Sequence, residues 1–283
     1  MSAESVSTPV PPPLPEAAKP VGGIRWAIHL AIMAAMPLAV AYFGMRRTES
    51  QGPALPSNVG GLLVACACNL LVFFLFFIIA RAISRASFDA LLLRWRPGAW
   101  VIPLGLAYSI AVRMLVAVVL IFVAVLLFAL HAVTPQDIQH FGQASTPRVD
   151  RLIDVEAMSS NSAYFWLNVT VVSFIVAGLR EELWRASFLA GLRGLWPSVF
   201  EGTKGGIAGA AVAALFFGAG HLPQGVAAAA VITVVGFGLG VIMVVHRSMW
   251  PAVVAHGAFD AASFAAIPWM MQHLDQLRHM GTV

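Results

Sequence analysis

Four charged side chains lie in the sequence Arg180-Glu181-Glu182-Leu183-Trp184-Arg185, which directly follows the apolar run 164–179. The apolar run has the composition of a membrane helix, and apolar residues resume over 186–192. An ionised side chain at the centre of a bilayer costs about 2.5–3.5 kcal/mol on insertion scales, so such residues usually serve a function. We therefore expect any chemistry of this protein to lie at this charged segment.

The composition is that of a polytopic membrane protein rather than of a soluble domain. Hydrophobic residues make up 59% of the 283 residues and charged residues 11%, with a mean hydropathy of +0.83. The isoelectric point near 9.6 would suggest a nucleic-acid partner in a soluble chain. Here the basic residues stand at the ends of apolar runs, where membrane proteins carry them. We therefore expect the lipid bilayer as a partner and no nucleic acid; Cys66 and Cys68 have no predicted role.

Seven apolar runs have about the length of a membrane span and predict an all-α bundle. The third run is long enough for one tilted helix or for two spans broken near Arg113, so seven to eight spans are expected. Arg113 is expected to pack inside the bundle or to snorkel rather than to contact substrate. Residues 88–96 mix apolar and basic side chains and are expected at the membrane interface. The seven runs are 26–45, 59–80, 100–133, 163–192, 205–221, 226–245 and 249–271.

The sequence predicts a Pro-rich tail over 1–22, a membrane domain over 23–272 with its catalytic core in 162–272, and a polar tail over 273–283. Residues 134–162 are expected to form an extramembrane loop. The distribution of basic residues favours a cytoplasmic N-terminus in a bacterial inner membrane, although Arg46 and Arg47 disagree. Several glycines are expected to let helices approach closely rather than to bind phosphate. They are Gly202, Gly205, Gly206, Gly209, Gly236 and Gly240.

The first of three polar clusters in the second half of the chain is the charged segment itself. Arg185 lies four residues after Glu181 and three after Glu182, so it can bridge to either carboxylate. A structural salt bridge at a helix end is the simpler interpretation. However, one arginine neutralises only one glutamate, and Arg180 is expected to point elsewhere. One carboxylate would then be free to act on water.

The other two clusters are centred on histidines. His221 ends an apolar run, and Glu181 and His221 are equally distant from the turn near Glu201, so an antiparallel hairpin places them at similar depth. His256 and Asp260 are four residues apart and share a helix face. Because His256 lies only about 10–14 Å along its helix from the preceding turn, tilt or an irregular turn is needed to bring it to His221.

These residue types together suggest the activation of water. A glutamate takes a proton from water, a neutral histidine helps to hold it, and a second histidine-centred group stabilises an oxyanion. Alternatively, Glu181, His221 and His256 can form a ligand set for a divalent metal such as zinc. Both interpretations favour the hydrolysis of an acyl bond, with no organic cofactor.

Three motifs resemble those of a known family: Glu181-Glu182-x-x-Arg185, Phe217-x-x-x-His221 and His256-x-x-x-Asp260. In this order, over residues 164–271, they look like the motifs of the CAAX prenyl protease and bacteriocin-processing family (CPBP, or Abi) of intramembrane endopeptidases. The resemblance implies a helical membrane bundle with a cavity open to the cytosol and the lipid, acting on a peptide or lipidated protein substrate. It also implies a glutamate-dependent mechanism, although the family has been called metalloendopeptidase.

The resemblance also implies roles for the site residues. Glu181 and His221 would activate the catalytic water, and His256 with position 260 would form the oxyanion site. Glu182 and Arg185 would be supporting residues.

The chain departs from the family pattern at three places. Two residues rather than three separate the glutamate pair from Arg185, so that, aligned on Arg185, Glu181 matches the second glutamate and Arg180 the first. Asp260 stands where the family has Asn, and Ala186 where it has Gly. An ionised aspartate cannot donate a hydrogen bond, so Asp260 must be protonated, orient His256 or bind metal.

Two non-enzymatic alternatives remain open on the sequence. The chain can be a non-catalytic scaffold or bacteriocin-immunity protein of the same fold. It can also be a transporter in which Glu181, Glu182 and His221 relay protons. The sequence has neither an inverted repeat nor matched broken helices, which argues against the transporter.

Overall fold

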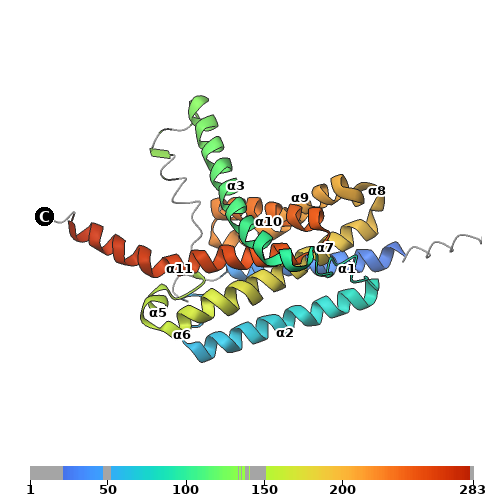
Figure 1. Ribbon diagram of the computed structural model, residues 1–283, viewed down its shortest axis with the longest axis horizontal. Coiled ribbons are helices and arrows are strands. Elements are labelled where there is room, and N and C mark those ends of the chain that lie inside the picture. The colour runs from blue at the N-terminus through green and yellow to red at the C-terminus, as the bar shows by residue number, and fades with distance from the viewer. Residues whose placement is uncertain are drawn as a thin grey trace, which may run out of the picture.

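The computed structural model describes residues 22–46, 52–132, 134, 136, 137, 140 and 151–280, with only the backbone described over 271–280. The expected Pro-rich tail and most of the expected loop after residue 133 lie outside the described residues. The described residues form an all-α bundle, and no strand occurs among them (Figure 1). The predicted all-α fold is confirmed.

Each predicted apolar run corresponds to one long helix or helical run. Six of them in the described chain are long and apolar enough to cross a membrane; α11 has the length but is less apolar. The run 100–133 forms a single helix rather than two. The elements are α1 Gly23–Met45, α2 Val59–Ser84, α3 Val101–Ala129, the continuous run Ser162–Leu195, α9 Gly202–Gly220, α10 Val226–His246 and α11 Trp250–Met280.

Shorter elements connect the long helices. Helix α11 continues to Met280, into the stretch expected as a polar tail. The short elements are η2 Gly98–Trp100, α5 Val155–Ser160, α8 Pro197–Phe200 and η5 Leu222–Gln224.

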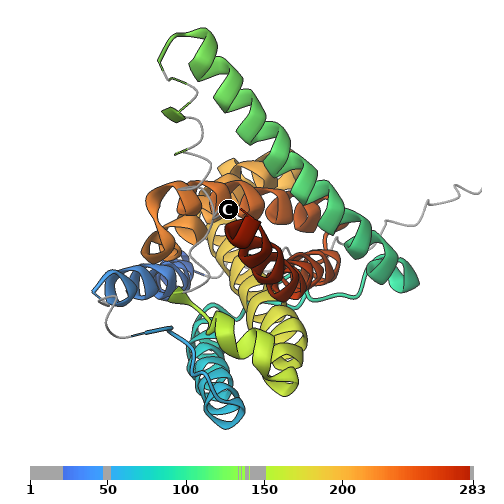
Figure 2. The ribbon, with the colours of Figure 1, turned by 90° about the vertical axis from the view of Figure 1, so that its left-hand side faces the viewer.

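Helix α3 packs on the bundle only through its first half. Its buried residues, Val101, Gly105, Ser109 and Val112, all precede residue 113. Beyond that point the helix leaves the other helices, as Figures 1 and 2 show in green, and side chains such as Phe122 are exposed. In a membrane this outer half faces lipid, as an apolar surface requires.

Residues 88–96 form turns rather than a helix and support the connection between α10 and α11. Leu91 and Leu92 are buried. The carbonyl of Leu92 accepts from the Met249 amide at 2.9 Å, and that of Leu93 from Trp250 Nε1 at 2.9 Å. The start of α11 is thereby fixed against the chain that leads into α3.

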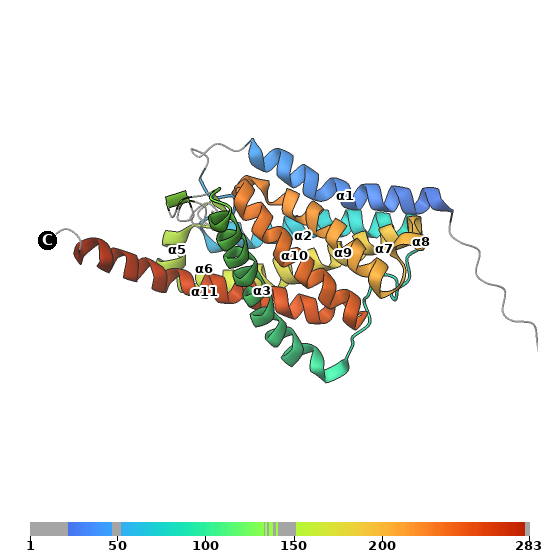
Figure 3. The same cartoon turned by 90° about the horizontal axis from the view of Figure 1, so that it is seen from above.

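Glycines bring α9 and α10 into close contact, as predicted. These helices lie side by side in Figure 3. A Cβ atom on Gly206 would lie 2.8 Å from Val244, and one on Gly240 would lie 2.8 Å from Ala210. Larger residues at either position would push the two helices apart.

The α1 helix is attached to its neighbours by a buried histidine. His29 Nδ1 lies 3.0 Å from the carbonyl oxygen of Ala80 on α2, and Nε2 lies 2.9 Å from that of Ser187 on the run Ser162–Leu195. Trp184 Nε1 donates to the Met33 carbonyl at 2.8 Å. These polar contacts fix α1 beside the charged segment.

The run Ser162–Leu195 changes its winding before the charged segment. It consists of α6 Ser162–Leu167, the π-helix η4 Asn168–Leu179 and α7 Arg180–Leu195. Ser173 Oγ donates to the Asn168 carbonyl, five residues back, at 2.8 Å. Extended π-helices are rare, and single π-helical turns are frequently found at functional sites. The change of winding determines which side chains of α7 face α11.

Close packing against α11 depends on Gly178, near the end of the π-helix. A Cβ atom there would lie 3.0 Å from the carbonyl oxygen of Val253, a backbone atom that cannot rotate away. We expect Gly178→Leu to destabilise the fold by about 1–3 kcal/mol, because the larger side chain overpacks this contact. A lowered midpoint of thermal unfolding in detergent would measure the loss.

Gly60→Leu is the matched control. Gly60 is exposed in the first turn of α2, and a Cβ atom there would have no close tertiary neighbour. Equal destabilisation by the two substitutions would contradict the close approach at Gly178.

Candidate active site

The two glutamates of the charged segment have different surroundings. Glu182 is completely buried and forms an ion pair with Arg185, three residues later. Its Oε1 also accepts a hydrogen bond from His256 Nδ1 at 2.8 Å. Of the two carboxylates that Arg185 can reach by spacing, the structure pairs it with Glu182.

The Arg185 side chain is held on the aromatic ring of the second motif. Its guanidinium carbon lies 4.4 Å from the centre of the Phe217 ring, and the side chain is fully buried. Gly236 and Gly240 on α10 leave room for it: Cβ atoms there would lie 3.5 Å from Arg185 Nη2 and 3.6 Å from Cδ. A cation over an aromatic face is stabilised when desolvated.

Glu181, by contrast, is partly exposed, with 16% of its side-chain surface accessible. It forms an ion pair with Arg180, so the prediction that Arg180 points elsewhere is wrong. Arg180 Nε donates to the Val176 carbonyl at 2.9 Å and Nη1 to Asn69 Oδ1 at 3.0 Å. The long side chain folds back along the helix, which lets Nη2 reach the adjacent carboxylate.

His256 lies between three carboxylates. With Nδ1 bonded to Glu182, its Nε2 lies 3.9 Å from Glu181 Oε2 and 3.6 Å from Asp260 Oδ2. These two separations are longer than a direct hydrogen bond. They suit polar groups that share a third partner, such as a water molecule or a carbonyl oxygen.

His221 directly follows α9 and has a defined hydrogen-bond partner. Its Nδ1 lies 2.8 Å from the Phe217 carbonyl, which can only accept, so Nδ1 carries the proton. A neutral ring in this tautomer has a lone pair on Nε2. Glu181 and His256 lie within electrostatic range of His221.

Phe217 is the common neighbour of the three motifs. Its ring centre lies 4.7 Å from that of His221, 6.1 Å from that of His256 and 6.2 Å from that of Trp184. The Phe217 side chain of α9 therefore packs against both the charged segment and α11 and sets their distances from α9.

Arg113 packs within the bundle, as expected. It donates to the Phe259 carbonyl and, at 3.2 Å, to Ser263 Oγ, and lies over the Phe259 ring. It also interacts electrostatically with Asp260.

The residues considered as metal ligands do not form a metal site as arranged. In the described part of the chain, no group of three or more His, Cys, Asp or Glu side chains is placed to hold a metal ion. This includes the expected alternative ligand set of Glu181, His221 and His256. No step below is therefore assigned to a metal.

The sequence interpretation missed Asn69, which contacts the site from α2. Asn69 is the only amide or charged residue in the apolar run 59–80. A lone amide in an apolar membrane run is expected to hydrogen bond within the bundle. That signal would have been sufficient to find it.

The fold and the site define a multi-pass membrane protein with carboxylates and histidines from three helical segments gathered inside the bundle. Residues 162–262 match the family described as type II CAAX prenyl endopeptidase Rce1-like. The match confirms the resemblance over that segment and supports an intramembrane protease of the CAAX type as the kind of function. No curated protein and no solved structure matches.

The surroundings of the glutamates predict unequal effects on stability. We expect Glu182→Gln to destabilise the fold by about 3–5 kcal/mol, because it leaves the buried Arg185 without a counter-charge. Glu181→Gln, at the partly exposed carboxylate, should cost much less. Thermal unfolding of both variants in the same detergent measures the difference.

The double variant Glu182→Gln/Arg185→Met provides the control for an unpaired charge. Removing both charges should restore part of the stability that Glu182→Gln loses. Equal stability of the two single glutamine variants would contradict a structural role for the buried pair.

Proposed function

We propose that this chain is an intramembrane endopeptidase that hydrolyses a peptide bond of a membrane-embedded or lipidated substrate. The observation that carries the proposal is the 3.9 Å separation between Glu181 Oε2 and His256 Nε2, with His221 nearby. A carboxylate that can take a proton thus faces a ring that can bind an oxyanion.

Glu181 is proposed as the general base. It is the more exposed glutamate, whereas Glu182 is occupied by Arg185 and His256. Glu181 takes a proton from water while the lone pair on His221 Nε2 accepts the second hydrogen of that water. The oxygen attacks the scissile carbonyl carbon, giving a tetrahedral intermediate. Glu181 then gives its proton to the leaving nitrogen as the C–N bond breaks.

His256 is proposed as the oxyanion donor. To donate from Nε2 while Nδ1 donates to Glu182, the ring must carry both protons, and Glu182 and Asp260 stabilise that form. Asp260 would therefore support His256 rather than donate to the oxyanion itself. This role suits an aspartate where the related motif has an amide.

The distribution of basic residues supports a cytoplasmic N-terminus, and an inner-membrane location remains part of the proposal. Basic residues gather where α2, α7 and α10 end and where α1 and α9 begin, and such ends lie on the cytoplasmic side. They are Arg25, Arg81, Arg85, Arg94, Arg96, Arg193, Lys204 and Arg247. Arg46, at the end of α1, remains on the opposite side.

The base and its partner are tested by Glu181→Ala and His221→Ala. We expect each to reduce peptide cleavage by about 100-fold or more, because general acid–base groups contribute about 10²–10⁴-fold. Purified protein in liposomes would be assayed with fluorogenic prenylated and unprenylated membrane peptides, with and without a chelator. Unchanged thermal unfolding would show that each variant is folded.

Normal cleavage by either folded variant would refute the assignment. Loss of wild-type activity in chelator, restored by zinc, would replace the metal-free mechanism. Absence of cleavage of every peptide would favour the non-catalytic scaffold.

Asp260→Asn tests the oxyanion side of the proposal. Asparagine cannot stabilise a doubly protonated His256 by charge, but its amide can donate to an oxyanion. We expect Asp260→Asn to lose part of the activity, because Glu182 still stabilises the doubly protonated ring and the amide can donate, and Asp260→Ala to lose more, by about tenfold or more. A comparison of kcat for the two variants gives the answer, and equal kcat values would contradict a polar role at this position.

A further inference from the structure

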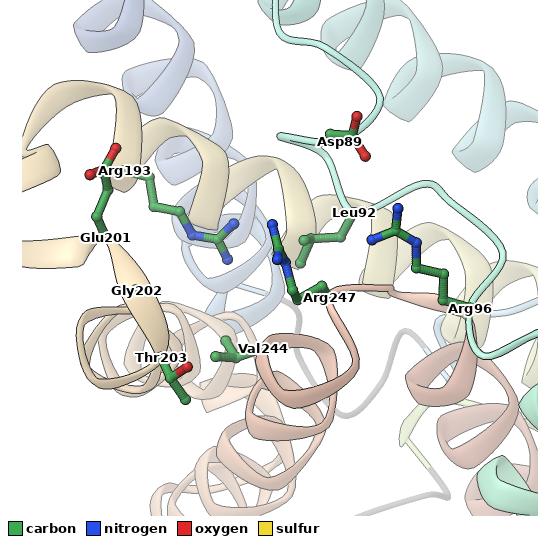
Figure 4. A pocket seen from close by; sticks show the side chains of 9 residues that line it. All are labelled: Asp89, Leu92, Arg96, Arg193, Glu201, Gly202, Thr203, Val244 and Arg247. Carbon is green, nitrogen blue, oxygen red and sulfur yellow. The ribbon is translucent and has the colours of Figure 1, made fainter.

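A second cluster of charged side chains lies at the basic end of the bundle, away from the candidate active site. It lines a cavity of about 350 Å³ where α7 and α10 end and α9 begins. Arg96, Arg193 and Arg247 contribute to its wall; we call it the arginine cavity (Figure 4). Arg193 lies eight residues after Arg185 on α7, about 12 Å along the helix.

The arginines of this cavity lack acidic partners. Arg193 and Arg247 are close enough to repel one another, and their guanidinium groups point toward each other in Figure 4. Within the described ranges, no ion pair joins Arg96, Arg193 or Arg247 to a carboxylate. Two carboxylates reach the rim, but Asp89 pairs with Arg94 and the Glu201 carboxylate points away from the guanidinium groups. Like charges held this close favour the binding of an anion between them, because arginine forms strong charge-assisted hydrogen bonds to phosphate and carboxylate.

The first turn of α9 adds an independent signal for an anion. Gly202 and Thr203, its first residues, line the cavity. Glu201 precedes the helix but makes no side-chain capping bond, so the first amides are without that partner. Gly202 has a φ of +68°, and the space next to its Cα is open. The N-terminus of a 19-residue helix carries partial positive charge and binds phosphate through such amides.

Aromatic residues indicate that the cavity lies at the level of the lipid headgroups. Trp95 and Trp250 pack with ring centres 5.2 Å apart near the start of α11, and Trp100 and Trp196 are exposed at the neighbouring helix ends. Tryptophan concentrates at membrane–water interfaces. The cavity is therefore within reach of both lipid headgroups and soluble anions.

We propose that the arginine cavity binds a phosphate group, either in the headgroup of an anionic phospholipid or as soluble phosphate. The planar guanidinium group of arginine binds two phosphate oxygens at once, and the backbone amides at the start of α9 complete the site. Binding neutralises the repulsion between Arg193 and Arg247 and joins the ends of α7, α9 and α10. The site is separate from the candidate active site and does not depend on the proposed protease activity.

The test measures the thermal unfolding of the purified full chain in a zwitterionic detergent. One arm titrates short-chain phosphatidylglycerol, a second titrates phosphatidylcholine with the same acyl chains, and a third titrates inorganic phosphate. We expect phosphatidylglycerol or inorganic phosphate to raise the unfolding midpoint, and phosphatidylcholine to have no effect. A response to phosphatidylglycerol alone assigns the lipid headgroup, and an equal response to phosphate assigns the soluble anion.

Arg193→Gln and Arg247→Gln should each weaken binding about tenfold or more, because each removes charge-assisted hydrogen bonds to the phosphate. Arg25→Gln is the matched control, since Arg25 is exposed in the first turn of α1 at the same end but outside the cavity. Without ligand, Arg193→Gln should be at least as stable as the wild type, because one repulsion is removed.

Either of two results would overturn the proposal. One is the absence of any midpoint shift in the wild type with both phosphate-bearing probes. The other is a midpoint shift in both cavity variants as large as that of the wild type. Loss of the shift in Arg25→Gln as well would likewise overturn the proposal, because it would indicate non-specific electrostatic binding.

Discussion

The ion pair between Glu182 and Arg185 is the interaction around which the rest of the site is arranged. Both side chains are fully buried, and a single buried charge would be far more costly than the pair. Glu182 also binds His256 on α11, and Arg185 lies on Phe217 of α9. One pair on one helix thus determines how three helices meet, and it leaves Glu181 as the carboxylate with access to a reactant.

The other two carboxylates of the site, Glu181 and Asp260, also have an arginine nearby. Glu181 has Arg180 beside it, and Asp260 has Arg113 within electrostatic range. These two arginines also donate to backbone carbonyls, so their positions are set by the helices and not only by the acids. An apolar bundle can hold three carboxylates together because each has an arginine fixed nearby. The arginine cavity lacks this balance, which distinguishes it from the interior site.

Much of the fold follows from the sequence because lipid imposes a simple rule on helix length. Each long apolar run became one helix or helical run. The partner of Arg180 could not be deduced, because a helical wheel assumes α winding and fixed side-chain directions, whereas η4 is a π-helix and Arg180 folds back along it. The meeting of His256 with Glu182 depended on tertiary offsets between helices that residue counts do not contain.

Helix α3 has one consequence for the candidate active site. Its inner half packs on α11, where Gly105 meets Val254, and the apolar side chains of its outer half are exposed. The tilt of such a helix is set by its packing against neighbouring helices. Arg113 stands at the boundary between the two halves and holds the Phe259 carbonyl, one residue before Asp260. One arginine therefore joins the exposed, apolar helix α3 to the helix that carries His256 and Asp260.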